Sequence, residues 1–271
     1  MSVTNTLLHR LRRGRETMAY PAGPAPALPD RHGGALRVDS STCADGCRAC
    51  LTVCPTEAIR RPDDGPVKLD LGRCIFCSAC VTVCPEGSIT RTGDHRMAAR
   101  DRLDLVLGDP GHERVRLAGA LATKLQKLFG RSLRLRQVSA GGCNACEADT
   151  NVLGTIGWDL GRFGIQFVAS PRHADGVLIT GPVTKNMELA LAQTWDAMPD
   201  PKIVIAVGAC AIAGGPFVGH PEVNDGAAAV VPVDLYIPGC PPHPLTILDG
   251  LLRLLDKLDE GDAAPSGPRS G

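Results

Sequence analysis

The chain has 271 residues, and its 29 Lys plus Arg balance its 29 Asp plus Glu, so its formal net charge is zero. This length accommodates one large domain or two modest ones. The balanced charge and an aromatic content of only 3% argue against nucleic acid as a partner, because such surfaces are basic and stack bases on aromatic rings. The most apolar run, residues 203–219, is broken by glycines and a proline and predicts a buried strand with a glycine-rich loop, rather than a membrane helix.

Residues 1–35 predict a basic helix followed by a proline-rich arm. Leu7, Leu8 and Leu11 recur at helical spacing among arginines, and the Pro/Ala run that follows predicts an extended backbone. We expect this segment to dock on a partner or a membrane surface. A disordered basic tail is one alternative. A transit peptide is a second alternative, because acidic residues are scarce in this segment.

Residues 36–95 carry eight of the twelve cysteines in two runs that are near copies of each other. The first reads C-ADG-C-RA-C-LTV-C-P from Cys43 to Pro55, and the second reads C-IF-C-SA-C-VTV-C-P from Cys74 to Pro85. A C-x2-C-x2-C-x3-C-P run gives three thiolates to one [4Fe–4S] cube and its last cysteine to another. The repetition therefore predicts a small α+β domain of the bacterial 2[4Fe–4S] ferredoxin type, made by internal duplication.

The two predicted ligand sets cross between the runs. One set is Cys43, Cys47, Cys50 and Cys84, and the other is Cys54, Cys74, Cys77 and Cys80. Pro55 and Pro85 push the preceding cysteines toward an extended backbone, which aims each fourth ligand away from its own run. Zinc sites use paired C-x2-C units with a longer spacer, and a disulfide framework needs an oxidising compartment, so both alternatives are weaker.

The spacing from Cys43 to Cys47 is one residue longer than the pattern. We expect a bulged loop that still delivers the Cys43 thiolate. The alternative is that this ligand is lost, which leaves a three-iron cluster or a labile site.

Residues 131–258 alternate between strand-like and helix-like segments, after a charged connector, residues 96–130, that we expect to be helical. The predicted strands are 133–138, 165–169, 176–180, 202–207 and 231–237, and the predicted helices are 184–198 and 244–258. This order predicts an α/β domain with a parallel sheet. Residues 259–271 are expected to be a disordered tail.

The remaining cysteines follow the predicted strands of this sheet. They are Cys143, Cys146, Cys210 and Cys240. Ligands bind at the carboxyl ends of parallel strands, and nearby glycines such as Gly142, Gly208 and Gly239 allow backbone N–H groups to approach sulfur. We therefore predict a third [4Fe–4S] site, with buried structural cysteines as the alternative.

Several motifs of the second domain resemble a known family. They are GGCNACE at 141–147, ASPRHADGVLITGPVT at 169–184, GACAIAGG at 208–215 and VPVDLYIPGCPPHPLTIL at 231–248. This domain resembles the small subunit of membrane-bound group 4 [NiFe]-hydrogenases of the formate hydrogenlyase type, and it is similar to the cluster-bearing 20 kDa subunit of respiratory complex I. That 20 kDa subunit typically has two adjacent cysteines at the first ligand position, whereas two residues separate Cys143 from Cys146. The N-terminal half resembles the two-cluster ferredoxin subunit of the same complexes, including the Tyr20–Pro21 arm, so the chain resembles a fusion of two subunits.

This resemblance implies a flavodoxin-like domain and three [4Fe–4S] clusters, with the cluster of Cys143, Cys146, Cys210 and Cys240 nearest a separate large subunit. It also implies membrane subunits as partners, a soluble redox donor or acceptor at the ferredoxin domain, and a peripheral position on the cytoplasmic face of the inner membrane. No C-x2-C pairs are left over for nickel and iron, so we expect an electron-transfer subunit of an oxidoreductase without a catalytic site. The alternatives are a component of a complex I-related quinone oxidoreductase or of a nickel-free relative, and a free electron carrier, against which the whole second domain argues.

Three further residues in these motifs invite a functional interpretation. Glu147 follows Cys146 directly, where an acid favours a helix N-terminus, and the acid that the family carries at this place implies proton handling. His173 and His243 are interpreted as loop or interface histidines, because four cysteines already satisfy a cube.

Overall fold

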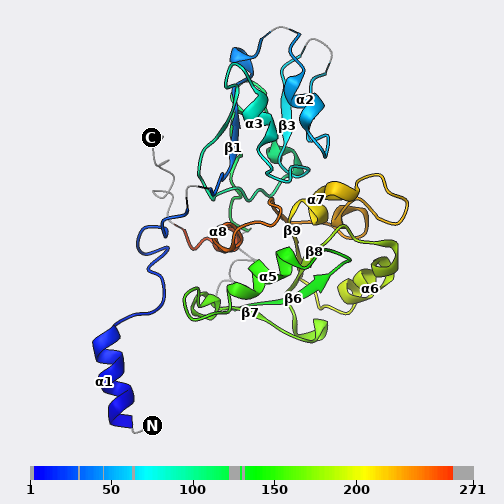
Figure 1. Cartoon of the computed structure of the whole chain (residues 1–271). Coiled ribbons are helices and arrows are strands. Elements are labelled where there is room, and N and C mark those ends of the chain that lie inside the picture. Colours follow the sequence, from blue (N-terminus) through cyan, green and yellow to red (C-terminus); the bar gives the residue numbers. More distant parts are fainter. Residues whose placement is uncertain are drawn as a thin grey trace.

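The computed structural model describes residues 3–29, 31–44, 46–62, 65–121, 129 and 132–258. These residues form two halves that stack on each other (Figure 1). We call residues 35–113 the ferredoxin half and residues 132–258 the sheet half. Within the described residues, no helix is long and apolar enough to cross a membrane.

The ferredoxin half repeats one small unit twice. Helices α2 (Ala49–Val53) and α3 (Ala79–Val83) each begin just before the third cysteine of a run and end just before its fourth. Both fourth cysteines, Cys54 and Cys84, have φ −76° and an extended backbone, as expected before a proline. Strand β1 (Leu36–Val38) pairs with β4 (Ile89–Arg91), and β2 (Ile59–Arg60), β3 (Lys68–Asp70) and β5 (Val106–Leu107) form a second antiparallel sheet.

The helical connector expected at residues 96–130 is wrong for residues 96–121, and residues 122–128 and 130 lie outside the described residues. Residues Arg102–Leu105 form a 3-10 turn and then continue into β5, which pairs with β3. Leu105 and Leu107 are fully buried with Val106 partly exposed between them, and this period of two is that of a strand. The ferredoxin half therefore extends beyond residue 95.

The sheet half contains five parallel strands in the order β10-β9-β8-β6-β7. They are β6 (Leu133–Ser139), β7 (Ile165–Phe167), β8 (Gly176–Thr180), β9 (Ile203–Val207) and β10 (Leu235–Ile237). Taken in chain order this is 2-1-3-4-5, the flavodoxin-like arrangement, so the predicted fold class is confirmed. Strand β10 is shorter than the predicted 231–237.

Both faces of the parallel sheet are covered. The helices of the sheet half are α5 (Ala145–Val152), α6 (Lys185–Asp196), α7 (Ala209–Ala213) and α8 (Pro244–Leu254), with 3-10 turns at Leu160–Phe163, Pro171–His173, Gly215–Phe217 and Ala227–Ala229; the ferredoxin half has 3-10 turns at Ser40–Thr42 and Arg102–Leu105. Side chains alternate along each strand, so Val177 and Ile179 of β8 join a core with α6, α7 and the ferredoxin half, whereas Leu178 joins a core with α8. One apolar core is therefore continuous between the two halves.

The N-terminal segment consists of helix α1 (Val3–Arg13), which stands away from the body in Figure 1, and an arm, residues 14–29. The arm lies on the sheet half. Arg162 donates to the carbonyls of Met18 and Tyr20 at 2.7 Å each, and the buried Tyr20 hydroxyl donates to Asp249 at 3.1 Å. The proline-rich arm is thus a strap across the sheet half. The tail expected at residues 259–271 lies outside the described residues.

Candidate iron–sulfur sites

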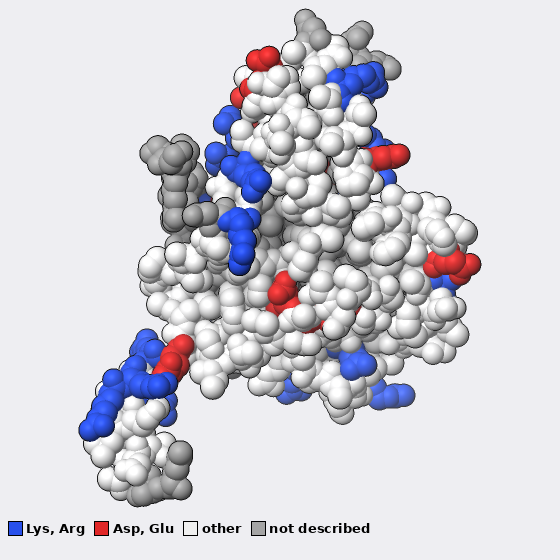
Figure 2. All heavy atoms as spheres, viewed as in Figure 1, with Lys and Arg blue, Asp and Glu red and all other residues white. Residues whose placement is uncertain are grey.

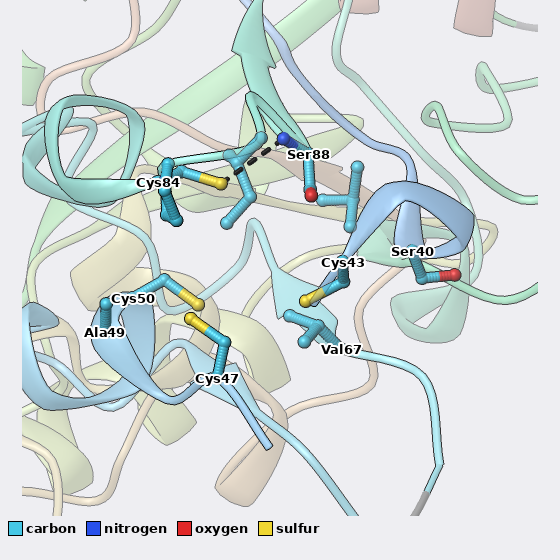
Figure 3. Close-up of a pocket in the computed structure, with 11 residues that line it drawn as sticks. Ser40, Cys43, Cys47, Ala49, Cys50, Val67, Cys84 and Ser88 are labelled. Carbon is cyan, nitrogen blue, oxygen red and sulfur yellow. Dashed lines mark hydrogen bonds between the residues drawn. The ribbon is translucent and has the colours of Figure 1, made fainter. Parts of the chain in front are cut away.

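The first site is the pocket around Cys43, Cys47, Cys50 and Cys84, with an apolar wall that includes Val38, Val67 and Ile89. Figure 3 shows the four thiols pointing toward one another, three from the first cysteine run and one from the end of the second. The Ser88 amide donates to Cys84 Sγ at 3.2 Å. The structure therefore brings together the set that the crossed pattern predicts, and the longer spacing after Cys43 does not remove its thiol from the pocket.

The second site is the matching pocket around Cys54, Cys74, Cys77 and Cys80. Backbone amides point at two of its sulfurs, since Ala58 N lies 3.3 Å from Cys54 Sγ and Phe76 N lies 3.3 Å from Cys74 Sγ. These are the hydrogen bonds that stabilise charge on sulfur. Each site again combines three thiols of one run with one of the other.

Burial opposes ionisation of Cys50, Cys74 and Cys80. It raises the pKa of Cys74 to about 12 and that of Cys80 to about 11, and neighbouring thiols of the same site add to the increase. For Cys84 burial acts in the same direction, but hydrogen bonds from the Ile89 and Ser88 amides outweigh it and lower the pKa. Without a bound metal, these buried thiols therefore keep their protons. A cationic metal centre fits such a site, because a thiol that coordinates a metal loses its proton.

None of the twelve cysteines forms a disulfide. Within the described residues, no group of three or more His, Cys, Asp or Glu side chains is placed to hold a single metal ion. Four thiols instead line each ferredoxin pocket, which fits the donor set of a four-iron cube.

The third site lies at the carboxyl edge of the parallel sheet. Cys143 and Cys146 follow β6, Cys210 lies in α7 directly after β9, and Cys240 follows β10. The strand order reverses between β6 and β8, so the first pair stands at the topological switch point, where ligands of such sheets bind. Burial, and then the charges of the other thiols and of Glu147, raise the pKa of Cys146 to about 12 and that of Cys210 to about 11.

Two glycines keep space free beside the third site. A Cβ at Gly208 (φ +91°) would lie 2.6 Å from Cys146 Sγ, and one at Gly215 (φ +56°) would lie 2.8 Å from Cys210 Sγ. Both positions have a left-handed backbone as well, so glycine is favoured twice over. Gly208 was expected from the sequence, whereas Gly215 was missed; its signal is the Gly214–Gly215 pair that closely follows Cys210.

Glu147 is buried next to the third site, with 5% of its surface exposed. The Thr180 hydroxyl donates to its Oε1 at 2.6 Å. Burial opposes ionisation, but hydrogen bonds from Ser139 and Thr180 outweigh it and lower the pKa of Glu147. The site therefore contains a carboxylate held in its charged form, and the sequence identified Glu147 without its partner Thr180.

The duplicated domain contains two pockets of four thiols, and the flavodoxin-like sheet carries a third set of four. These features define an iron–sulfur protein with two cluster-binding domains. Residues 143–254 match the family model described as NADH ubiquinone oxidoreductase, 20 Kd subunit, and residues 35–92 match a 4Fe-4S dicluster domain. A probable membrane-bound hydrogenase subunit, mbhJ of Pyrococcus furiosus, is 43% identical over 146 residues, which are 54% of this chain and 87% of that protein. The chain belongs to the family of the NADH ubiquinone oxidoreductase 20 Kd subunit.

Two further proteins are similar to about half of this chain. Formate hydrogenlyase subunit 7 of Escherichia coli is 43% identical over 141 residues, 52% of this chain and 55% of that protein, so the match spans about half of this relative. A chain of the membrane-bound sulfane sulfur reductase, an archaeal respiratory membrane complex, has 33% identity and a TM-score of 0.44, covering 54% of this chain and 80% of that chain. The chain is thus an iron–sulfur electron-transfer subunit of an oxidoreductase complex, and the resemblance to a 20 Kd-type subunit fused to a two-cluster ferredoxin is confirmed.

Proposed function

We propose that this chain holds three [4Fe–4S] clusters and relays electrons within a membrane-associated complex of the [NiFe]-hydrogenase type. The ligands are those of the first site (Cys43, Cys47, Cys50, Cys84), the second site (Cys54, Cys74, Cys77, Cys80) and the third site (Cys143, Cys146, Cys210, Cys240). Bound [4Fe–4S] clusters take up and release single electrons, and amides close to sulfur together with burial set their potentials. The amides of Ala58, Phe76 and Ser88 serve that purpose in the ferredoxin half.

The observation that carries this proposal is the geometry of the third site. Cys143 and Cys240 are exposed at the carboxyl edge of the sheet, whereas Cys146 and Cys210 are partly buried behind them. Two thiols therefore face the protein and two face outward. A large subunit seated on this edge excludes water from the site and brings its own redox centre close to Cys143 and Cys240.

The ferredoxin half supplies the other end of the relay. Cys50 of the first site contributes to the raised pKa of Cys80 in the second site, so the two sites are electrostatic neighbours. The apolar core continues from the second site, through Leu71 and Cys74, to Ile212 beside the third site. We therefore place a redox donor or acceptor at the first site and the large subunit at the third.

The names of the relatives favour nickel in the large subunit, since one is a probable membrane-bound hydrogenase subunit and the other a formate hydrogenlyase subunit, and two residues separate Cys143 from Cys146 as in the hydrogenase type. The 20 Kd family model favours the second candidate, a quinone-linked or nickel-free complex.

Helix α1 supports a peripheral position on the membrane. Val3, Leu7 and Leu11 are exposed, and Figure 2 shows Lys and Arg side chains gathered on the protruding N-terminal segment, toward the end that joins the body. An amphipathic basic helix suits the anionic surface of the cytoplasmic leaflet. We place the complex on that face of the inner membrane.

The test is to tag the chain, purify it with its complex from native membranes, and determine iron and nickel. Three clusters give about twelve iron per chain, whereas about eight means that one site is empty. Stoichiometric nickel together with hydrogen-dependent dye reduction supports the hydrogenase type. Iron without nickel contradicts it and favours the quinone-linked candidate.

A further inference from the structure

The two halves meet at a rigid seam. Ala99 of the ferredoxin side and Tyr236 of β10 exchange two backbone hydrogen bonds, at 3.0 and 2.8 Å. On the ferredoxin side, Asp70 at the end of β3 binds Arg102 through two contacts of 2.6 and 2.8 Å, which fix the segment that faces the sheet half. Together with the continuous apolar core, these contacts hold the chain that leads to Cys74 against the sheet half.

Gly72 lies at the centre of this seam and is buried. A Cβ placed there would lie 2.7 Å from Ile212 Cγ2 and 2.6 Å from Arg102 Cζ, closer than carbon atoms pack. Unlike Gly208 and Gly215, Gly72 does not have a left-handed backbone, so its conformation suits any residue. Lack of space, and not backbone geometry, therefore requires glycine at this position.

Neither neighbour of Gly72 is free to move aside. The Arg102 guanidinium is held by both oxygens of Asp70, and Asp70 also accepts a hydrogen bond from the Gly72 amide at 2.9 Å. Ile212 is 4% exposed, and behind it Gly226 approaches so closely that a Cβ there would lie 2.8 Å from the Ile212 carbonyl oxygen. A side chain at position 72 must therefore push α7 and the ferredoxin half apart.

The contact joins two cysteines by a short path. Gly72 is two residues before Cys74 of the second site, and Ile212 is two residues after Cys210 of the third site. Electron tunnelling through protein slows steeply as the gap between redox centres widens. A contact that sets the distance between these two segments therefore sets the rate of the step between the two sites.

We propose that Gly72 is a positioning residue for electron transfer between the second and third sites: by lacking a side chain it lets the segment leading to Cys74 lie directly against α7, which carries Cys210. This inference rests on the proposed three-cluster relay. The Asp70–Arg102 pair fixes the segment in that position.

The experiment compares Gly72→Ala and Gly72→Val in the full chain, purified with its complex. Pulsed electron paramagnetic resonance measures the distance between the reduced second and third clusters, and freeze-quench spectra after a light flash with a photoreductant follow the arrival of the electron at the third. We expect unchanged cluster number and potentials, a longer distance and a several-fold slower arrival, with Val more affected than Ala. Gly119→Val is the matched control, because Gly119 is exposed and has open space around it.

A rescue variant separates a steric effect from a general loss of packing. Ile212→Leu removes the Cγ2 methyl at nearly constant volume, whereas the contact with Arg102 remains, so adding it to Gly72→Ala is expected to bring the distance and the rate part of the way back to their wild-type values. If Gly72→Val has the wild-type distance and rate, the role of Gly72 is overturned while the three-cluster relay stands. If Gly72→Val does not assemble, a wild-type distance and rate in Gly72→Ala overturn the role of Gly72 instead. A wild-type chain without a third cluster defeats the proposed function itself, before any variant is compared.

Discussion

The two ferredoxin sites and the third site are built in different ways. In the ferredoxin half, eight cysteines lie in two short runs, and the local helices α2 and α3 each carry the third cysteine of a run. In the sheet half, the four cysteines are spread over about a hundred residues, from Cys143 to Cys240, and the parallel sheet brings them to one edge. The first kind of site is encoded by local spacing, and the second is encoded by strand order.

This difference determines how each site meets the rest of the complex. The cysteines of the second site lie largely within the shared core, where Cys74 and Cys80 are buried. The third site has Cys143 and Cys240 exposed, because the carboxyl edge of a sheet is an open surface. The second site thus exposes one thiol, Cys77, and the third exposes two, so in the proposed complex the third site is the one that meets the large subunit.

The largest expected effect comes from Cys240→Ser. This change removes one of the exposed thiols of the third site, so we expect iron to fall from about twelve to about eight per chain. Turnover of the complex should be lost, while the two ferredoxin signals in electron paramagnetic resonance remain. Retained turnover with full iron content would contradict the assignment of the third site.

The crossed arrangement is tested by Cys84→Ser. Cys84 belongs to the second run by sequence but lines the first site in space. We expect the signal of the first site to change to that of a three-iron cluster or disappear, with the second and third sites intact. Cys54→Ser is the reciprocal control and should affect the second site. Loss of the second-site signal in Cys84→Ser would mean that each run serves its own cluster.

A smaller effect is expected for Tyr20→Phe, which removes the hydroxyl that the strap places on the buried Asp249. A hydrogen bond to a charged group contributes about 1.5–3 kcal/mol. We therefore expect the free energy of opening the strap to fall by about that amount. Hydrogen exchange of the Met18 amide, which is bonded to the Gly157 carbonyl, measures the opening directly. Tyr236→Phe makes the same chemical change at the other tyrosine, outside the strap. Unchanged exchange in Tyr20→Phe would show that the arginine contacts alone hold the strap.

The smallest effect concerns His243, which begins α8 by accepting a hydrogen bond from the Leu245 amide at 3.1 Å. Burial, with added repulsion from His32 and His95, lowers the pKa of His243 to about 4. Because the unfolded chain binds the proton near pH 6.5, the contribution of neutral His243 is complete above that pH and is lost as the pH falls toward 4. Since the side chain is only half-buried, we expect a loss of about 1 kcal/mol at pH 5.

His243→Asn tests this pH dependence. Asparagine keeps an acceptor at the start of the helix but does not titrate in this range. The thermal midpoint of the wild-type chain should therefore decrease more between pH 7 and pH 5 than that of the variant. Parallel pH profiles would exclude His243 as the titrating group.

Most of the sheet half was predictable because its strands are apolar and buried on both faces. Strand β8 was predicted with its observed bounds, and β9 with one residue more. The start of β10 was less predictable: Pro232 lacks a donor, and only Leu235–Ile237 pairs with β9. Charge and helix propensity suggested a helix at residues 96–121, but tertiary pairing of β5 with β3 determined the structure there.

The candidate sites were predictable to different depths. Every cysteine set could be predicted, because spacing encodes the ferredoxin pockets and strand ends encode the third. The surroundings could not: the bond from Thr180 to Glu147 and the contact of Gly72 with Ile212 join residues far apart in the chain. Such contacts depend on packing between elements, which periodicity does not report.

The strap also has a consequence for the order of events during synthesis. Tyr20 and Asp249 are 229 residues apart in the chain. At 5–20 residues per second, Tyr20 is synthesised roughly 11–46 s before Asp249. The strap must therefore wait for α8 to be synthesised, and it closes only over a sheet half that has already been completed.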